Sequence, residues 1–406
     1  MARLLGRRFS LLWAAFATSA AGTWLAFDAF PLIAILVLHA GPVEVSLLAA
    51  AGPAAGALLA TLAGPFVAAR CPRPVMIGAD LMRFAVLATV PLAHLAGWLG
   101  LPQLLAVAVV VAAADIAFTA ASGAFLKSVV APGDLLVANG RFESTTWVAT
   151  AVGPPLGGFA VGVLGPVTTV VANAVSFLAS AAWIRRIGPV AETPVAVPAV
   201  RRGDLVDGWR VLLRHPVLRP LLLNVVAVNS LIMATAPVAA VLMLGELGFA
   251  PWQYALAFGA PCIGGLVGAR LSGRLVARFS ETTVLRVGGT LRAVWSGAVA
   301  FVPAGAWGIV LVIAVQFCLV ACAGVFSPVL ATTRLRLLPD DRLVRGLTAW
   351  SVSTKAAIAA VTALWGLLAA ATGPRVAIAA AGVLLLATPL LLPRRVPAAT
   401  TGDGGH

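Results

Sequence analysis

The sequence predicts an all-α polytopic membrane protein in which twelve transmembrane helices form two pseudo-symmetric six-helix bundles. The 406-residue chain is 61% hydrophobic and only 10% charged, a balance that excludes a soluble globular domain. Its apolar runs are long enough to cross a ~30 Å hydrocarbon core. Short segments also recur about half a chain apart. Together, these observations favour two parallel halves embedded in a bilayer.

Twelve apolar runs follow one another, and each is expected to be one transmembrane helix. We place them at 9–38, 43–69, 74–99, 102–127, 136–164, 166–186, 218–244, 251–277, 283–304, 307–333, 343–371 and 374–393. The expected units are an N-terminal bundle (1–186), a cytoplasmic linker (187–217), a C-terminal bundle (218–393) and a disordered cytoplasmic tail (394–406). Between Gly203 and His215 the linker has the pattern of an amphipathic helix at the membrane surface.

The basic residues indicate the orientation of these helices. Formal net charge is +14, but the arginines are spread over alternate breaks between the apolar runs, a distribution that argues against nucleic-acid binding. The other set of breaks contains no basic residue, and only Arg375 lies close to it. By the positive-inside rule, both termini are expected to be cytoplasmic.

The chain repeats itself at a nearly constant offset. Gly64-Pro-Phe-Val-Ala-Ala-Arg70 corresponds to Gly273-Arg-Leu-Val-Ala-Arg278, and Arg83 corresponds to Arg292, both 209 residues on. Pro132-Gly-Asp134 corresponds to Pro339-Asp-Asp341 at 207 residues. Because each half has an even number of spans, the halves have parallel orientation, as in a transporter whose site lies between two bundles.

The fifth span contains the unusual segment Gly153-Pro154-Pro155-Leu156-Gly157-Gly158. Adjacent prolines remove backbone donors from a helix interior, which is tolerated in a membrane where neighbouring helices satisfy the freed carbonyls. The four-residue glycine spacing leaves one side of the helix smooth, so another backbone can approach closely. We therefore expect a kinked helix pressed against a partner, the alternative being a Gly/Pro loop.

Twelve spans, two repeated halves and this segment resemble the major facilitator superfamily, whose exporters carry a similar "antiporter" motif in the fifth span. The branch containing enterobactin exporters and macrolide efflux proteins is similar in Arg8-Phe-Ser-Leu-Leu-Trp13, in 204–218 and in 132–139. The resemblance implies a bacterial inner-membrane exporter, usually driven by proton influx, that rocks its halves around a central site.

The chain departs from the family pattern at two places. In the family, an acidic residue precedes the arginine of the loop after the second span, and this chain has Ala69 there and Ala277 at the equivalent position of the second half. The contact by which this loop holds the eleventh span in the family should therefore be weakened, or shifted onto Asp80 and Arg83. The branch usually has Gly-Asp-Trp in the first span, whereas this chain has Gly22-Thr23-Trp24.

Ionisable residues within the spans are the candidates for ion coupling, because each is costly in a bilayer. Asp28 and Asp115 are predicted to handle a proton, since a carboxyl group in an apolar cavity exchanges protons nearer to neutral pH. Alternatively, either acid pairs with an arginine or caps a backbone break. Lys355 is predicted to pair with one of these acids or with an anionic substrate. Alternatively, its side chain extends along the helix so that the ammonium group reaches the membrane surface.

Two further groups of residues have predicted roles. The substrate-cavity candidates are Trp24, Phe27, Phe118, Asn224, Asn229, Gln316 and Lys355. The alternatives are hydrogen bonds between helices for the amides and lipid contact for the aromatic residues. The cytoplasmic-gate candidates are Arg70, Arg73, Asp80, Arg83, Arg141, Glu143, Gly273, Arg278 and Arg292.

The leading functional hypothesis is proton-coupled export of a small amphipathic organic compound, such as a drug, an antibiotic or a siderophore-like metabolite, by a monomer in the lipid bilayer. An ion-independent facilitator or flippase, or an importer, is the alternative within transport. A membrane enzyme or scaffold is the alternative outside it. No catalytic or metal-ligand spacing is visible among the four histidines and four cysteines, so we expect no enzyme activity, cofactor or metal.

Overall fold

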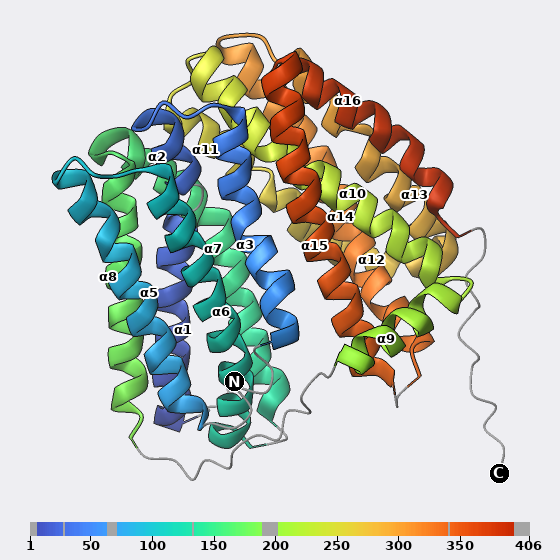
Figure 1. Ribbon diagram of the computed structural model, residues 1–406. Coiled ribbons are helices and arrows are strands. Elements are labelled where there is room, and N and C mark those ends of the chain that lie inside the picture. Colours follow the sequence, from blue (N-terminus) through green and yellow to red (C-terminus); the bar gives the residue numbers. More distant parts are fainter. Residues whose placement is uncertain are drawn as a thin grey trace.

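A computed structural model describes residues 6–26, 29–62, 71–131, 134–188, 202–339 and 342–393. This part of the chain is helical and contains no β-strand. Figure 1 shows the N-terminal half (blue to green) and the C-terminal half (yellow-green to red) side by side. The all-α prediction is confirmed, and each of the twelve expected spans coincides with one helix or with two consecutive helices.

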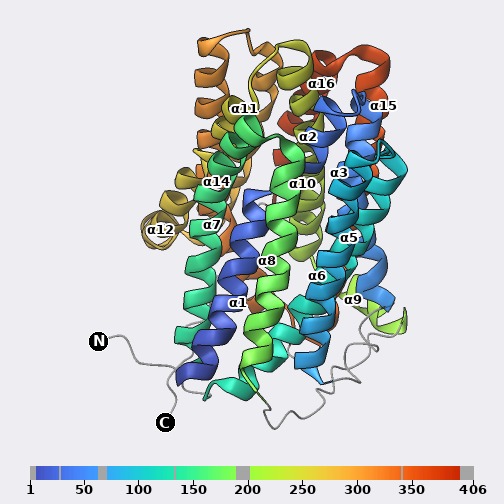
Figure 2. The ribbon, with the colours of Figure 1, turned by 90° about the vertical axis from the view of Figure 1, so that its left-hand side faces the viewer.

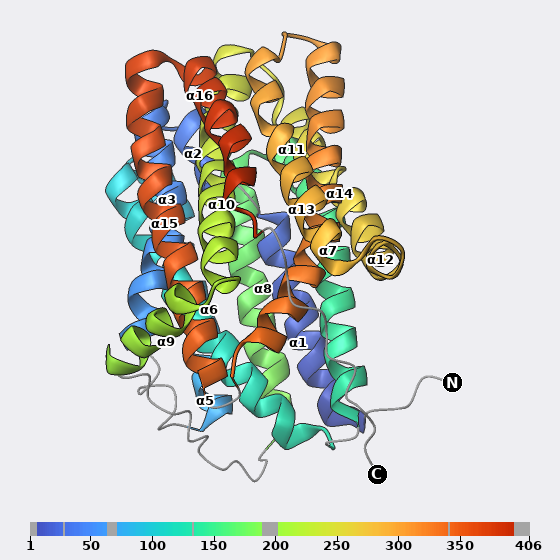
Figure 3. The same ribbon diagram turned by 90° about the vertical axis from the view of Figure 1, so that its right-hand side faces the viewer.

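The N-terminal half is seen from its outer side in Figure 2, and the C-terminal half in Figure 3. The first half contains α1 (Gly6–Leu25), α2 (Ala29–Leu36), α3 (Pro42–Leu62), α5 (Pro72–Leu95), α6 (Leu101–Val129), α7 (Leu135–Leu164) and α8 (Pro166–Arg186). The second contains α10 (Leu218–Ala240), η2 (Val241–Glu246), α11 (Pro251–Gly259), α12 (Cys262–Phe279), α13 (Glu281–Val294), η3 (Ser296–Phe301), α14 (Ala306–Leu337), α15 (Leu343–Thr372), α16 (Pro374–Ala387) and η5 (Thr388–Leu391). Among the described residues, nine segments of 18 residues or more are apolar enough to cross a membrane.

The helix α9 (Arg202–Arg214) lies between the halves in sequence and packs on α15. A side chain at Gly208 would overlap the carbonyl of Arg345, so α9 and α15 approach closely. The Trp209 indole nitrogen donates to Ser353 Oγ at 2.9 Å, and Leu212 is fully buried. Trp209 and Leu212 of α9 are therefore packed against the C-terminal half, whereas Leu213 on the same helix is 47% exposed. The position of α9 at the membrane surface stays a prediction. We call the end of the molecule where α9 lies the α9 end and the other the far end.

Short turns at the far end repeat between the halves. Gly165 and Gly373 are 208 residues apart, have φ of 83° and 88°, and each precedes a proline that starts the next helix. Gly97 and Gly305 are also 208 residues apart, with φ of 72° and 87°. Positive φ favours glycine, and proline fits the first helical turn because its missing donor is not needed there. The internal repeat therefore extends to the turns.

Arg375, the basic residue that departs from the charge pattern, has a structural role at the far end. Its two guanidinium nitrogens donate to the carbonyls of Ala300 and Val302, each at 2.9 Å. These carbonyls belong to the end of η3, where backbone acceptors lack helical partners. Gly297 of η3 and Gly382 of α16 also lie in backbone contact. Arg375 thus ties α16 to η3 instead of marking a cytoplasmic loop.

The smooth face of α7 packs against helices from both halves. A side chain at Gly153 would overlap Trp24, and one at Gly157 would overlap the Leu25 carbonyl, both at the end of α1. A side chain at Gly158 would overlap Ala255 of α11, in the other half. α7 is a single helix from Leu135 to Leu164, so the prolines at 154 and 155 do not interrupt it. The close approach predicted from the glycines occurs with two partner helices.

Because the backbones meet at Gly157, we expect Gly157→Ala to destabilise the protein. Overpacking of a close contact costs about 1–3 kcal/mol, which should lower the melting temperature of the detergent-purified protein. Gly162→Ala is the matched control on the same helix, since the nearest atom to its added carbon, Trp252 Cδ1, is 3.9 Å away. Equal melting temperatures for the two variants would contradict the close α1–α7 packing.

Candidate functional site

The candidate site is a charged cluster centred on Arg83 of α5. The Arg83 Nη2 lies 2.5 Å from Oδ1 of Asp80, one turn earlier on the same helix. Its Nη1 lies 3.1 Å from Oδ1 of Asp115 on α6. The side chains of Asp80 and Arg83 are 0% and 2% exposed, whereas that of Asp115 is 62% exposed. One buried ion pair is therefore joined to one accessible carboxylate.

Two aromatic rings flank the same guanidinium. The Arg83 Cζ lies 4.6 Å from the ring centroid of Phe118 on α6 and 4.2 Å from that of Phe177 on α8. Charged hydrogen bonds and cation–π contacts both strengthen in surroundings from which water is excluded. Arg83 is eleven residues from the start of α5, or roughly 16 Å along the helix at 1.5 Å per residue. An unpaired charge at that depth would be expensive.

The charges of the cluster define what it can do chemically. Two carboxylates share one guanidinium, so the cluster has one net negative charge when both acids are ionised. Asp80 is enclosed with Arg83, whereas Asp115 is the carboxylate of the cluster that solvent or a ligand can reach.

The corresponding arginine of the second half has a different environment. Arg292 is 4% exposed, and its Nη2 donates to Oδ1 of Asn224 at 2.7 Å. The Asn224 amide nitrogen donates to the carbonyl of Thr388 at 2.8 Å. The Arg292 Cζ lies 3.8 Å from the ring centroid of Phe326. Each of these partners is neutral, so the acidic groups of the first cluster have no counterpart around Arg292 in the residues that the structure describes.

Sequence positions account for this difference. Gly289 is 209 residues after Asp80, and Ala323 is 208 residues after Asp115. Both acids of the first half are thus replaced by small neutral residues in the second.

The predicted cavity residues have different surroundings. Asn224 is fully buried and bonded to Arg292 and Thr388, which favours the interhelical role that the sequence left open. Lys355 of α15 is half-buried against Gly56 of α3, at the contact between the halves. The other described candidates, on α1, α10 and α14, are half-buried: Trp24, Asn229 and Gln316.

The predicted gate residues that the structure describes make contacts within their own half. Arg73 donates to the carbonyls of Ile184 and Arg185 at 3.3 and 2.8 Å. Arg141 lies over the ring of Phe9 and Arg278 over that of Phe279, and Gly273 lies on α12. Asp80 and Arg83 pair with each other and with Asp115, so their contacts do not latch the halves together.

Some predicted residues lie outside the described part of the chain. These are Phe27, Asp28 and Arg70, and the side chains of Glu143, Pro154 and Pro155.

Sequence reasoning missed the aromatic partners of both arginines. The sequence suggests a cavity role for Phe118 and no role for Phe177 or Phe326. The internal repeat contained the signal, because Phe118 and Phe326 are 208 residues apart and Arg83 and Arg292 are 209 apart. An arginine and an aromatic residue that recur together are expected to be in contact in both halves.

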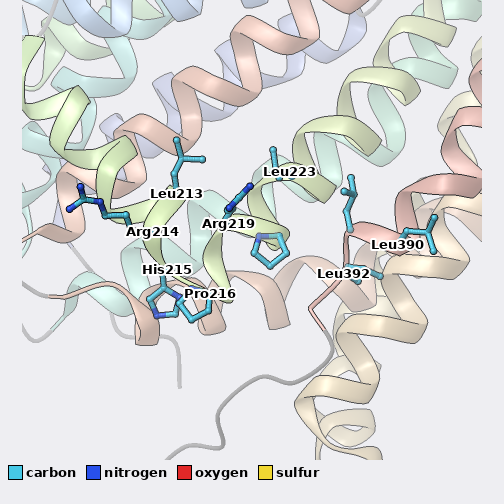
Figure 4. Close-up of a pocket in the computed structure, with 10 residues that line it drawn as sticks. Leu213, Arg214, His215, Pro216, Arg219, Leu223, Leu390 and Leu392 are labelled. Atoms are coloured by element: carbon cyan, nitrogen blue, oxygen red, sulfur yellow. The ribbon is translucent and has the colours of Figure 1, made fainter.

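A separate pocket of about 390 Å³ lies at the α9 end, where α9 turns into α10 (Figure 4). His215 lies in this turn, and its Nδ1 accepts hydrogen bonds from the backbone N–H groups of Val217 and Leu218, each at 3.2 Å. Burial lowers the pKa of His215 from its usual value of 6.5. Neutral His215 thus caps the start of α10, and the pocket contains none of the charged-cluster residues.

Comparison with known proteins places the chain among membrane transporters. The sequence pattern described as "Major Facilitator Superfamily" matches residues 12–319. A relative from Bacillus subtilis (strain 168), an uncharacterized MFS-type transporter called YvqJ, is 26% identical over 204 residues. That match covers 49% of this chain and spans only about half of the relative, 48% of its length.

Solved transporter structures have a similar fold. The nucleoside transporter NupG has a TM-score of 0.75 at 9% identity, with 95% of this chain and 99% of that chain covered. A bacterial homologue of the iron transporter ferroportin scores 0.70 in its inward-facing state, at 16% identity with 94% and 98% coverage. The outward-facing state of such a homologue scores 0.62, at 17% identity with 95% and 98% coverage. At these identities the likeness concerns the fold alone.

The two arginines should differ in their importance for stability. Arg83→Met leaves two carboxylates without their cation, and breaking a buried pair costs about 3–5 kcal/mol. Arg292→Met leaves only the neutral Asn224 oxygen unsatisfied, which costs about 1–3 kcal/mol. The free energy of unfolding, measured by denaturant titration of the purified protein, should therefore fall further for Arg83→Met. An equal or larger loss for Arg292→Met would contradict the charge assignment.

The His215 cap should make stability depend on pH. Because the folded-state pKa is lowered, the contribution of His215 is fully present above pH 6.5 and is lost as the pH falls through the folded-state value. The melting temperature of the wild type, relative to that of His215→Asn, should therefore decrease between pH 8 and pH 5. A constant difference over this range would show that protonation of His215 does not affect α10.

Proposed function

The chain belongs to the Major Facilitator Superfamily, and from that membership we propose that it is a proton-coupled exporter of an amphipathic organic compound. Its family makes it a multi-pass membrane transporter and not an enzyme. Beyond family membership, we propose the direction of transport, the kind of substrate and the coupling ion. The observation that carries it is the accessible Asp115 carboxylate next to an arginine that Asp80 already pairs.

Alternating access is supported by where the two halves touch. Gly158 meets Ala255 and Pro251, and Gly366 meets Ser46, all near the far end of the helices. The ribbons of the two halves lie close together at the top of Figure 1 and farther apart towards α9.

The distribution of arginines supports an orientation for this state. In the proposed topology the α9 end and both termini are cytoplasmic, because the basic breaks lie at that end. Arg375, the exception near the far end, is bonded to η3 and does not weaken this assignment. In that orientation, the ribbons of the two halves are farther apart on the cytoplasmic side of a bacterial inner membrane, which suits uptake of a compound for export.

Proton exchange at Asp115 provides a coupling mechanism. Protonated Asp115 releases the second contact of Arg83 and makes the cluster neutral, while its deprotonated form leaves one net negative charge in the span. Because the negative form is costly in apolar surroundings, the charge state of Asp115 biases the equilibrium between conformations that hydrate it differently. Asp28, in the first span, is the second proposed carrier. The half-buried Trp24, Asn229, Gln316 and Lys355 offer few polar contacts, which suits an amphipathic substrate.

Transport in proteoliposomes tests this proposal directly. An internal pH-sensitive dye should report a proton flux when a suitable amphipathic compound is added to vesicles with the wild-type protein. We expect Asp115→Asn to reduce that flux at least tenfold, because an amide cannot carry the proton. Asp28→Asn tests the second carrier in the same way. The matched control is Glu44→Gln, a carboxylate in the first turn of α3 outside the cluster.

Three results separate the alternatives. Loss of substrate-dependent proton flux in Asp115→Asn or Asp28→Asn, with Glu44→Gln unchanged, supports the exporter and identifies its carrier. Substrate movement that persists in both variants without proton flux contradicts coupling and favours an ion-independent facilitator or flippase. Proton-driven accumulation towards the α9 side would contradict export and favour an importer.

A further inference from the structure

A groove of about 600 Å³ runs between α5 and α8 on the N-terminal half. Its walls are apolar side chains of α5 and α8, and its floor is formed by small residues. Leu81 and Leu178 are 44% and 42% exposed, and Gly78 is open enough that an added carbon would meet nothing within 4 Å. The groove therefore has an apolar lining that suits a hydrocarbon chain.

The head of this groove is basic. Its lining includes two arginines, Arg73 at the start of α5 and Arg185 at the end of α8, and no acidic residue. Arg73 donates to the carbonyls of Ile184 and Arg185, which lie in the last turn of α8. Arg185 is exposed. This arrangement gives the groove a positively charged end whose position is fixed by the helix terminus.

The basic end is expected to lie at the depth of lipid headgroups. Trp183, half-buried next to the groove, has the Arg186 guanidinium 5.1 Å from its ring, and tryptophan together with arginine at a helix end is typical of the membrane interface. Leu81 is eight residues beyond Arg73, and Leu178 is seven before Arg185. At 1.5 Å per residue the apolar walls extend roughly 10–12 Å from the charged end into the bilayer.

A second apolar groove lies on the other side of α5. It has a volume of about 660 Å³, lies between α5 and α6, and shares Pro74 and Gly78 with the first groove. Gly78 thus forms a low ridge between two channels that begin at the same end. Two hydrocarbon chains joined at one headgroup would fit across such a ridge.

The grooves are on the outer side of the N-terminal bundle. Pro74 and Arg83 are nine residues apart, which places them about 180° apart around the helix. Arg83 is enclosed between α6 and α8, so the Pro74 face of α5 points away from the charged cluster. The groove is therefore distinct from the proposed transport site.

We propose that this surface binds one anionic phospholipid from the leaflet at the α9 end, with its phosphate at Arg73 and Arg185 and its acyl chains on either side of Gly78. The combination of a basic head, apolar walls and interfacial depth is complementary to such a lipid. The site depends on the membrane location of the chain and not on the direction or coupling of transport. A negative transport assay therefore leaves it intact.

Lipid binding to the full-length, detergent-purified protein tests the proposal. Native mass spectrometry should show that phosphatidylglycerol is retained more strongly than phosphatidylcholine with the same acyl chains. Arg185→Gln should weaken phosphatidylglycerol binding about fivefold, the change expected for one arginine near the surface. Arg186→Gln is the matched control, because it removes the same charge one residue away and does not line the groove.

A second variant tests the chains. An added Cβ at Gly78 meets nothing within 4 Å, so Gly78→Leu should place its side chain in the grooves and weaken the binding of both lipids. Gly123→Leu, at another helical glycine whose added Cβ meets nothing within 4 Å, should not. Equal retention of the two lipids by the wild type, or equal effects of Arg185→Gln and Arg186→Gln, would overturn the headgroup assignment. Displacement of the lipid by glycerol phosphate alone would show an anion site and overturn the role of the chains.

Discussion

The pairing of Arg83 is the interaction on which the N-terminal half depends. A guanidinium inside a membrane span is tolerated only when its charge and its donors have partners. Asp80 supplies one partner from the same helix, and Asp115 supplies another from α6. The rings of Phe118 and Phe177 cover its faces from α6 and α8. A single side chain thereby fixes three helices relative to one another, and the cluster holds α5 as a rigid part of its bundle.

Contacts between the halves follow a different physical rule. They are made by small residues that let backbones approach, as at Gly158 against Ala255 and Gly366 against Ser46. Dispersion contacts of this kind are short-ranged and are lost without leaving an unpaired charge. The buried ion pair of Arg83 and Asp80, by contrast, lies within one half. Strong polar contacts inside each bundle and weak apolar contacts between them are what a rocking motion of two rigid bodies requires.

Sequence reasoning predicted the parts of the fold that depend on local pattern or on the repeat. Apolar run length located the helices, and the glycine spacing around Gly157 predicted a close packing face. It did not predict which side chains meet, because a contact such as Arg292 with Asn224 joins residues 68 apart on different helices. It also did not predict that α15 packs against α9, since an amphipathic pattern does not distinguish a lipid surface from a neighbouring helix.

The difference between the halves bears on where a proton can be carried. Internal duplication gave both halves a buried arginine over a phenylalanine, but among the residues that the structure describes only the arginine of the first half is paired with acids. Arg292 can stay charged among neutral partners because Asn224 and the Phe326 ring solvate it without titrating. The second cluster therefore has no group that changes charge near neutral pH. If proton coupling takes place at the Arg83 and Arg292 clusters, the proton must be carried by the N-terminal half. The C-terminal half then acts as the fixed body against which the N-terminal half rocks.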